Sequence, residues 1–209
     1  MARSLKKLIA AVFCLVLLFE LSSCAVNTKS AEQTGFSMGS LVGIKLYGKN
    51  SEALENANLL AEVVKTDERI SKNYEGSDIY RVNSSGEHGE TVSVETYDEL
   101  RTVCDVYSDS HGKAAALSGA LTELWGFDTD EFRLPSEDEI ISAKEKCGDD
   151  KLIFDDGKKV YIPDGAKLNL GSAGKGIALD EAVKKIDEIN SQGGKITGAV
   201  ISVGGSVAT

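Results

Sequence analysis

The stretch of this sequence best suited to chemistry is "LNLGSAGKGIALDEAV", residues 168–183, in which Lys175 stands between Gly174 and Gly176. A glycine-rich turn that enters a helix offers backbone N–H groups and the positive end of the helix dipole, and both bind phosphate oxygens. Lys175 would add a point charge. A nucleotide-binding P-loop is excluded, because only two residues separate Gly171 from Gly174. The loop alone equally allows a tight connection whose glycines merely permit close packing and positive φ.

The remaining metal-binding or nucleophilic side chains indicate no second site. His88 lies in a polar turn and His111 in "SDSHGK", and we expect both to be solvated because their spacing fits no metal site. Cys104 and Cys147 also lack metal-site spacing. They could form a disulfide in an exported protein, but two buried thiols are favoured.

Composition limits the partners. The chain has 209 residues, 33 acidic against 23 basic side chains, and a formal net charge of -10. This acidic balance argues against a nucleic-acid partner, so an anionic ligand would need a local basic site. With 42% hydrophobic residues and only two prolines, the chain can bury one sizeable core, and we expect one main domain.

Residues 1–23 have the pattern of a secretion signal. Basic residues precede an apolar run from Leu8 to Phe19 that is too short for a comfortable membrane span. The following "LSSC", residues 21–24, resembles the lipobox of bacterial lipoproteins, in which the cysteine is acylated. Cys24 would then become the lipid-bearing N-terminus. The alternative is a plain signal peptide or a short membrane anchor with an incidental cysteine.

The tether and the body follow. Residues 24–33 are small and polar without a period, as expected of a flexible tether, and the globular body is expected from residue 34. We therefore expect an exported chain, anchored through a lipid on Cys24 to the outer face of the bacterial cytoplasmic membrane or on the periplasmic side.

Hydrophobic periodicity predicts an α+β fold with a mixed sheet and packed helices. The turn-rich residues 73–94 are expected to lie over the surface. The predicted strands are residues 40–48, a hairpin within 151–163 and a buried strand in 196–205. The predicted helices are residues 52–72 with Ser51 as the cap, 97–110, 135–148 and 177–189.

Four segments in one order resemble the ApbE family, the FAD:protein FMN transferases. They are "FSMGSLVGIKLYG" (36–48), "SKNYEGSDIYRVN" (71–83), "SGALTELWGF" (118–127) and "LNLGSAGKGIALD" (168–180). "VGGSV", residues 203–207, resembles the next strand and glycine pair of the family. The resemblance implies an ApbE-like fold for residues 34–209, with the C-terminal part of the domain missing.

The resemblance also implies an activity. Members cleave the diphosphate of FAD and move FMN onto a threonine or serine hydroxyl of a partner protein, with Mg²⁺ neutralising the phosphates. FAD, Mg²⁺ and an acceptor protein are thus the expected cofactors and partners, together with a membrane and no nucleic acid. The alternatives are an FAD pyrophosphatase on the same scaffold and a non-catalytic flavin-binding surface lipoprotein.

Site residues follow from the matched segments. By the resemblance Met38 would line the flavin site, Asn73 or Tyr74 would face the flavin ring, and Lys175 would meet the FAD phosphates and serve catalysis. Asn169 stands where the family has an aspartate that contacts FAD, and the carbonyl of Ser172 would contact the metal. Ala114 and Ala115 stand where members carry Phe-Asp, so with Lys113 they would approach FAD only through backbone groups.

The last expectation concerns the end of the chain. Members continue beyond the glycine pair to a segment whose Asp and Ser or Thr complete the Mg²⁺ shell, and residues 1–209 contain no matching segment. Ser172 alone cannot hold a hard divalent ion that needs several oxygen ligands. The sequence therefore predicts either a fragment of a competent enzyme or a catalytically impaired one.

Overall fold

A computed structural model describes residues 28–127, 129 and 131–209 of this chain. The predicted signal in residues 1–23 and the lipidation site Cys24 lie outside the described residues. Within the described part, no helix is both long enough and apolar enough to cross a membrane.

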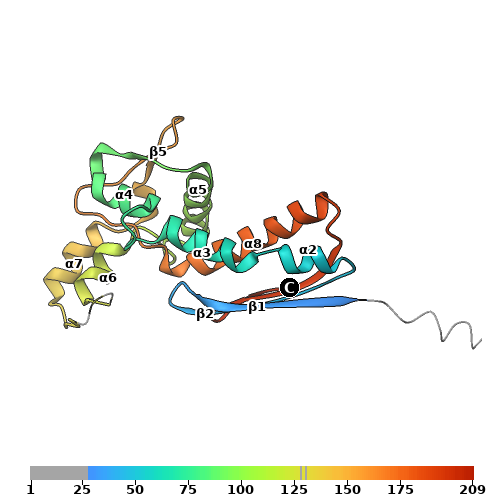
Figure 1. The fold of residues 1–209 in the computed structure, drawn as a ribbon. Helices are drawn as coiled ribbons and strands as arrows, with labels where there is room; N and C mark the ends of the chain where they lie inside the picture. Colours follow the sequence, from blue (N-terminus) through green and yellow to red (C-terminus); the bar gives the residue numbers. More distant parts are fainter. Residues whose placement is uncertain (1–27, 128, 130) are drawn as a thin grey trace, which may run out of the picture.

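A four-stranded sheet with three helices on one face forms the first half of the core (Figure 1). Its order is β1-β2-β6-β7, and every pair is antiparallel. The strands are β1 (Lys29–Ser37), β2 (Ser40–Gly48), β6 (Ile196–Val203) and β7 (Ser206–Ala208). The covering helices are α2 (Ser51–Asn56), α3 (Leu59–Ile70) and α8 (Gly174–Ser191).

The second half of the structure holds the segments between α3 and α8. A small antiparallel sheet of order β3-β5-β4 packs there with four helices and three 3-10 turns. The helices are α4 (Asp78–Ser85), α5 (Val94–Asp109), α6 (Gly119–Trp125) and α7 (Glu137–Glu145). The strands are β3 (Glu90–Thr91), β4 (Ile153–Phe154) and β5 (Lys159–Tyr161), and the 3-10 turns are η2 (Gly86–His88), η3 (Asp149–Lys151) and η4 (Leu170–Ser172).

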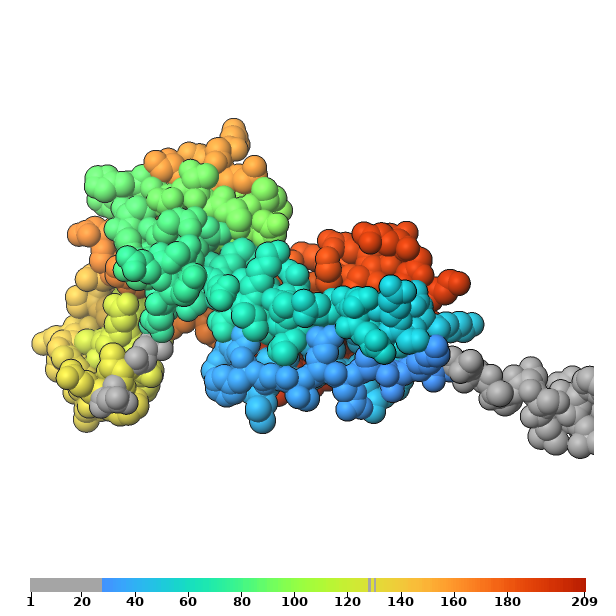
Figure 2. Space-filling view, viewed as in Figure 1, coloured from blue at the N-terminus to red at the C-terminus, as the bar shows by residue number. Residues whose placement is uncertain are grey.

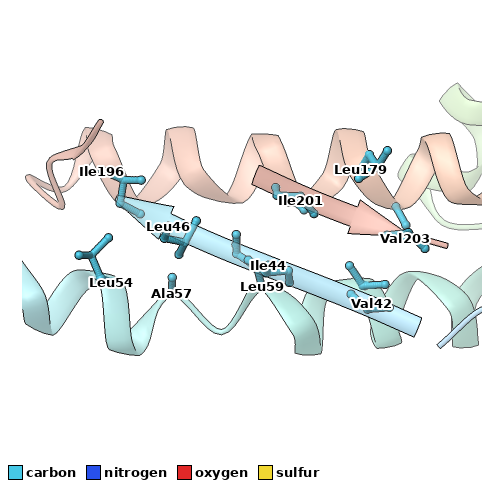
Figure 3. Close-up of a cluster of buried hydrophobic side chains, with 13 residues drawn as sticks. Val42, Ile44, Leu46, Leu54, Ala57, Leu59, Leu179, Ile196, Ile201 and Val203 are labelled. Atoms are coloured by element: carbon cyan, nitrogen blue, oxygen red, sulfur yellow. The ribbon is translucent and has the colours of Figure 1, made fainter. Parts of the chain in front are cut away.

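Two clusters of buried apolar side chains match these halves. The first lies between the large sheet and its helices, where Leu46 and Leu59 are fully buried (Figure 3). Burying such a leucine contributes roughly 1.5–3 kcal/mol. The second cluster lies under α4, α5 and the small sheet, and includes Ile79, Leu100 and Leu168. Met38 packs against both clusters, so the turn between β1 and β2 lies where they meet.

The structure confirms the predicted α+β fold with packed helices, although the strand pairs of the described residues are all antiparallel, so that neither sheet is mixed. The strand over residues 40–48 and the hairpin within 151–163 are present as β2 and as β4 with β5. Both cysteines of the body are free, as favoured over a disulfide, but they are half-buried rather than buried.

Three expectations need correction. Residues 29–33, assigned to the tether, form part of β1, which pairs with β2 from Lys29↔Gly48 to Ser37↔Ser40. The helix predicted over 52–72 is divided, because Asn58 adopts a left-handed conformation with φ 49°, and Asn50 rather than Ser51 caps α2. The segment 73–94 is not wholly superficial, because α4 buries Ile79 and Val82.

Candidate functional site

Two adjoining cavities collect most of the predicted site residues. Cavity A, of about 780 Å³, lies among the loop after α5, the start of α6, the end of α7 and η4. Cavity B, of about 340 Å³, lies between the β1–β2 turn, the end of α3 and the start of α8. Asn169 and Gly171 line both cavities, so the two form one cleft with two compartments.

The cleft brings together segments that are far apart in the sequence. The predicted residues lining cavity B are Met38, Asn73, Asn169 and Lys175. Those lining cavity A are Lys113, Ala114, Ala115, Asn169 and Ser172. Tyr74 lines neither cavity. Its side chain is 52% exposed and its ring lies over Gly76, so Asn73 is the residue of this pair that borders the cleft.

The glycine-rich loop ends in an open helix N-terminus beside cavity B. Helix α8 begins at Gly174 without a capping side chain, and Ile177 N–H is the first donor to close a helical turn, onto Ala173 O (3.0 Å). The amides of Gly174, Lys175 and Gly176 therefore have no acceptor within the helix. Such amides and the helix dipole favour an anion in cavity B.

Lys175 reaches the cleft along the turn between β6 and β7. A methyl group placed on Gly204 would lie 3.4 Å from Lys175 Cε and 3.0 Å from Ser40 Oγ. Gly204 also has φ +59°, which favours glycine. The "VGGSV" segment thus forms a hairpin turn against the aliphatic stem of the lysine, while the ammonium end is the part able to meet a ligand.

Met38 is presented to cavity B by a strained turn. Met38 and Gly39 connect β1 to β2 with φ of 51° and 65°, as in a two-residue type I′ hairpin, which normally prefers Asn or Gly. Asp67 on α3 stabilises the turn by accepting hydrogen bonds from Met38 N (2.7 Å) and Ser37 Oγ (2.9 Å). Asp67 also lines cavity B, and no local signal in the sequence pointed to it.

Hydrogen bonds of Asn169 connect the segments at the boundary between cavities A and B. Its Oδ1 accepts from Gly171 N (2.9 Å), its Nδ2 donates to Thr122 Oγ1 (3.1 Å), and its own N–H donates to Ala116 O (2.7 Å). Both ends of the side-chain amide are therefore engaged. An ionised aspartate could not make the donation to Thr122, so Asn169 is arranged here as a structural side chain.

A buried carboxylate anchors the other wall of cavity A. Asp149, 2% exposed, accepts from Leu117 N (2.6 Å) and Ala116 N (2.9 Å). Burial raises the pKa of Asp149, and the two amide donors oppose that rise. The loop that carries Lys113 to Ala115 is thereby fixed at its far end. Sequence reasoning missed Asp149, because a carboxylate in "GDDK" is not distinguishable from a solvated one.

The cleft is basic although the chain is acidic. Its lining includes Lys175 in cavity B and Lys113 and Lys144 in cavity A, against one carboxylate, Asp67. Lys144 and Lys72, which also lines cavity B, were not predicted, because only the fold brings the end of α7 and the segment after α3 to the cleft. A local surplus of cations in a chain of net charge -10 favours an anionic ligand.

The described residues do not fit a magnesium shell. None of their His, Cys, Asp and Glu side chains form a group of three that could hold a metal ion. Ser172 lines cavity A, but Mg²⁺ requires near-octahedral oxygen ligation.

The contacts of Asp67 allow a direct test of the turn. We expect Asp67→Ala to lower the free energy of unfolding by about 1–3 kcal/mol, because two donors near cavity B lose a charged acceptor. Asp67→Asn keeps an acceptor oxygen and should lose less. Urea denaturation measures both. Equal losses for the two variants would show that the hydrogen bonds do not stabilise the turn.

A basic, two-compartment cleft at a helix N-terminus is typical of α+β proteins that bind phosphate-containing ligands. The chain belongs to the ApbE family, whose model matches residues 38–209.

Individual relatives agree with this assignment. The FAD:protein FMN transferase of Haemophilus influenzae is 21% identical over 216 residues, which cover 97% of this chain and 61% of that protein. The crystal structure of the ApbE protein of Thermotoga maritima is similar with a TM-score of 0.76 and 26% identity, covering 86% of this chain and 58% of that one. The crystal structure of the apo flavinyl transferase ApbE of Pseudomonas stutzeri is similar with a TM-score of 0.70 and 24% identity. The match covers 86% of this chain and 58% of that one.

These comparisons confirm the predicted ApbE-like fold. They also show that this chain spans about three fifths of the length of the relatives it matches, 61% of the curated protein and 58% of each solved chain.

Proposed function

We propose that this chain carries the FAD-binding part of a flavin transferase that moves FMN from FAD to a threonine or serine hydroxyl of a partner protein. The observation that carries the proposal is the position of Lys175 in cavity B, which Met38 also lines, at the open N-terminus of α8. Membership of the ApbE family and the name of the Haemophilus influenzae relative support the same activity.

The cleft suggests a division of the ligand. The flavin would lie by Met38 and Asn73, the diphosphate at Lys175 and the amides of α8, and the adenosine part in cavity A near Lys113, Ala114 and Ala115. A thioether packs well on an aromatic face. The lysine and the helix dipole would hold the diphosphate and stabilise charge as its bond breaks.

In the proposed transfer, one bond to phosphorus forms and one breaks. The acceptor oxygen forms a new bond to the phosphorus of the FMN half, the bond from that phosphorus to the bridging oxygen breaks, and AMP leaves with the electron pair. The hydroxyl proton is released. Catalysis of this kind depends mainly on positioning and charge stabilisation, which are the two contributions that the described residues offer.

The location and the acceptor are part of the proposal. The basic start, the apolar run and "LSSC" support export and attachment through a lipid on Cys24. With that attachment, the chain would transfer FMN at the outer face of the membrane, to an acceptor protein that is also exported. Labelled palmitate incorporated by the chain and lost from Cys24→Ala would test the anchor.

The activity is tested by mass spectrometry. The whole chain is incubated with FAD and an acceptor domain that contains a flavin-accepting threonine, with Mg²⁺ or with EDTA. The proposal expects the mass of FMN on the acceptor and free AMP, and loss of both with EDTA would bear out the expected dependence on Mg²⁺. Free FMN without a labelled acceptor would instead indicate an FAD pyrophosphatase.

Two observations favour a second candidate, a flavin-binding protein without turnover. The amide of Asn169 is committed to Gly171 and Thr122, and the described residues form no magnesium shell. Titration of the chain with FAD separates the candidates, because a binder would show affinity that EDTA leaves unchanged and would yield neither FMN nor AMP.

A further inference from the structure

A second concave surface lies between α5 and α8, outside the cleft. This α5–α8 groove, of about 600 Å³, is lined by one face of α5 from Val94 to Val106 and by α8 from its first turn to Lys184. Figure 2 shows the surface indented between the green residues of α5 and the orange-red residues of α8. The groove takes no part in the proposed transfer.

The floor of the groove is apolar and partly open to solvent. Val103 and Ile177 form its deeper part and pack against the second core cluster. Val94 and Val106 are each 50% exposed, and Val183 is 41% exposed. Exposed valines gathered in one concavity are typical of an interaction site, whereas single exposed apolar residues are ordinary.

The edges of the groove are acidic. Glu95 and Asp98 on α5 and Asp180 on α8 are exposed, and no ion pair engages them among the described residues. Two further carboxylates are already paired, Glu99 with Arg69 and Glu181 with Lys184. Lys184 is the only cation among the lining residues, so the groove presents an uncompensated negative rim.

The α5 wall of the groove is held in place. Arg69 on α3 donates to Glu99 through both terminal nitrogens, with Nη2 to Oε1 at 2.7 Å, and Nη1 also donates to Thr96 Oγ1 at 2.9 Å. A bidentate pair of this kind fixes geometry as well as charge. The floor and rim are therefore a preformed surface rather than one that must be assembled by a partner.

The negative charge of the rim limits which kind of ligand could bind in the groove. A metal ion is disfavoured, because the carboxylates of the described residues include no group of three that could ligate one. A second copy of this chain, with a net charge of -10, would bring negative charge against the negative rim. The remaining fit is a partner that carries both apolar side chains and cations.

We infer that the α5–α8 groove docks an amphipathic helix of a partner protein, with apolar side chains on the floor and lysine or arginine along the rim. A helix between two helices presents side chains at i, i+3 and i+4 to such a floor. The N-cap and first turn of α8 place Ala173 and Ile177 in the groove and Lys175 in cavity B. A docked partner is thus held within one helical turn of the cleft.

A peptide probe tests this inference independently of flavin transfer. The probe is a fluorescein-labelled lysine and leucine helix of about 14 residues, long enough for four turns. Fluorescence anisotropy with the whole chain at about 50 mM salt should show saturable binding, because rim charges are weakly screened there. Asp98→Lys with Asp180→Lys should weaken binding at least about tenfold, and Val106→Ser should weaken it several-fold.

Matched controls decide the outcome. Glu52→Lys with Glu55→Lys changes the net charge equally on α2, which lies away from α5 (Figure 1), and should leave affinity within about twofold. An equal loss in this control would mean diffuse attraction and overturn the inference. Equal binding of a peptide with serine in place of leucine would overturn it too, as would a dimer of the chain that Asp98→Lys with Asp180→Lys dissociates.

Discussion

Replacement of Lys175 by alanine is expected to slow the attachment of FMN to the acceptor by at least about 100-fold. Removing one charge-stabilising donor from a preorganised site typically costs a factor of 100–1,000 in rate. Here the lysine stands beside the open N-terminus of α8, where charge would accumulate on the diphosphate as it breaks. The measurement is the initial rate of FMN mass gained by the acceptor, with circular dichroism to check the fold.

Lys65→Ala is the matched control for Lys175→Ala. Lys65 is an exposed lysine of α3 that pairs with Glu62 on the helix surface and lines neither cavity. The Lys65→Ala variant should transfer FMN at the rate of the unaltered chain. If Lys175→Ala did the same with unchanged affinity for FAD, the lysine would serve only the packing of the β6–β7 turn, and the proposed function would lose its main support.

Replacement of Asp149 by alanine is expected to lower the free energy of unfolding by about 3–5 kcal/mol. The variant leaves the amides of Ala116 and Leu117 buried without their acceptor, and each such loss typically costs 1–3 kcal/mol. That is a large part of the 5–15 kcal/mol that a domain usually has. Urea denaturation followed by circular dichroism measures the change.

Two further variants test whether the loss of stability in Asp149→Ala comes from the lost hydrogen bonds. Asp149→Asn keeps one oxygen but turns an N–H toward the second amide, so its loss should lie between those of the unaltered chain and the alanine variant. Asp156→Ala, at an exposed position of the β4–β5 turn, should stay within about 0.5 kcal/mol. A small loss for Asp149→Ala would mean that water replaces the carboxylate.

The sequence predicts this fold well where a signal is local. The alternation in residues 40–48 and the Asp-Asp-Gly turn after Phe154 are complete within short windows, and β2 and the β4–β5 hairpin follow. Strand β1 was not predicted as a whole, because its outward side chains before Phe36 are polar and its stability depends on pairing with β2. The break at Asn58 depends on one left-handed residue that helical periodicity does not reveal.

The cleft shows the same limit. The resemblance gathered Met38, Asn73 and Lys175 from matched segments, and the structure places all three on cavity B. The carboxylates that hold the walls, Asp67 and Asp149, carry no signature, because their importance depends on backbone amides distant in sequence. Acceptors of this kind can be recognised only once the chain has folded.

Because the two core clusters meet at Met38, we expect ligand binding in cavity B to be coupled to cooperative unfolding. Because Met38 packs on both clusters and its amide is held by Asp67, local opening of either cluster would release the side chain that borders cavity B. A molecule bound there favours only states in which both halves are closed. Slowed hydrogen exchange should therefore spread through the large sheet and the α4–α5 half together rather than stop at the cleft.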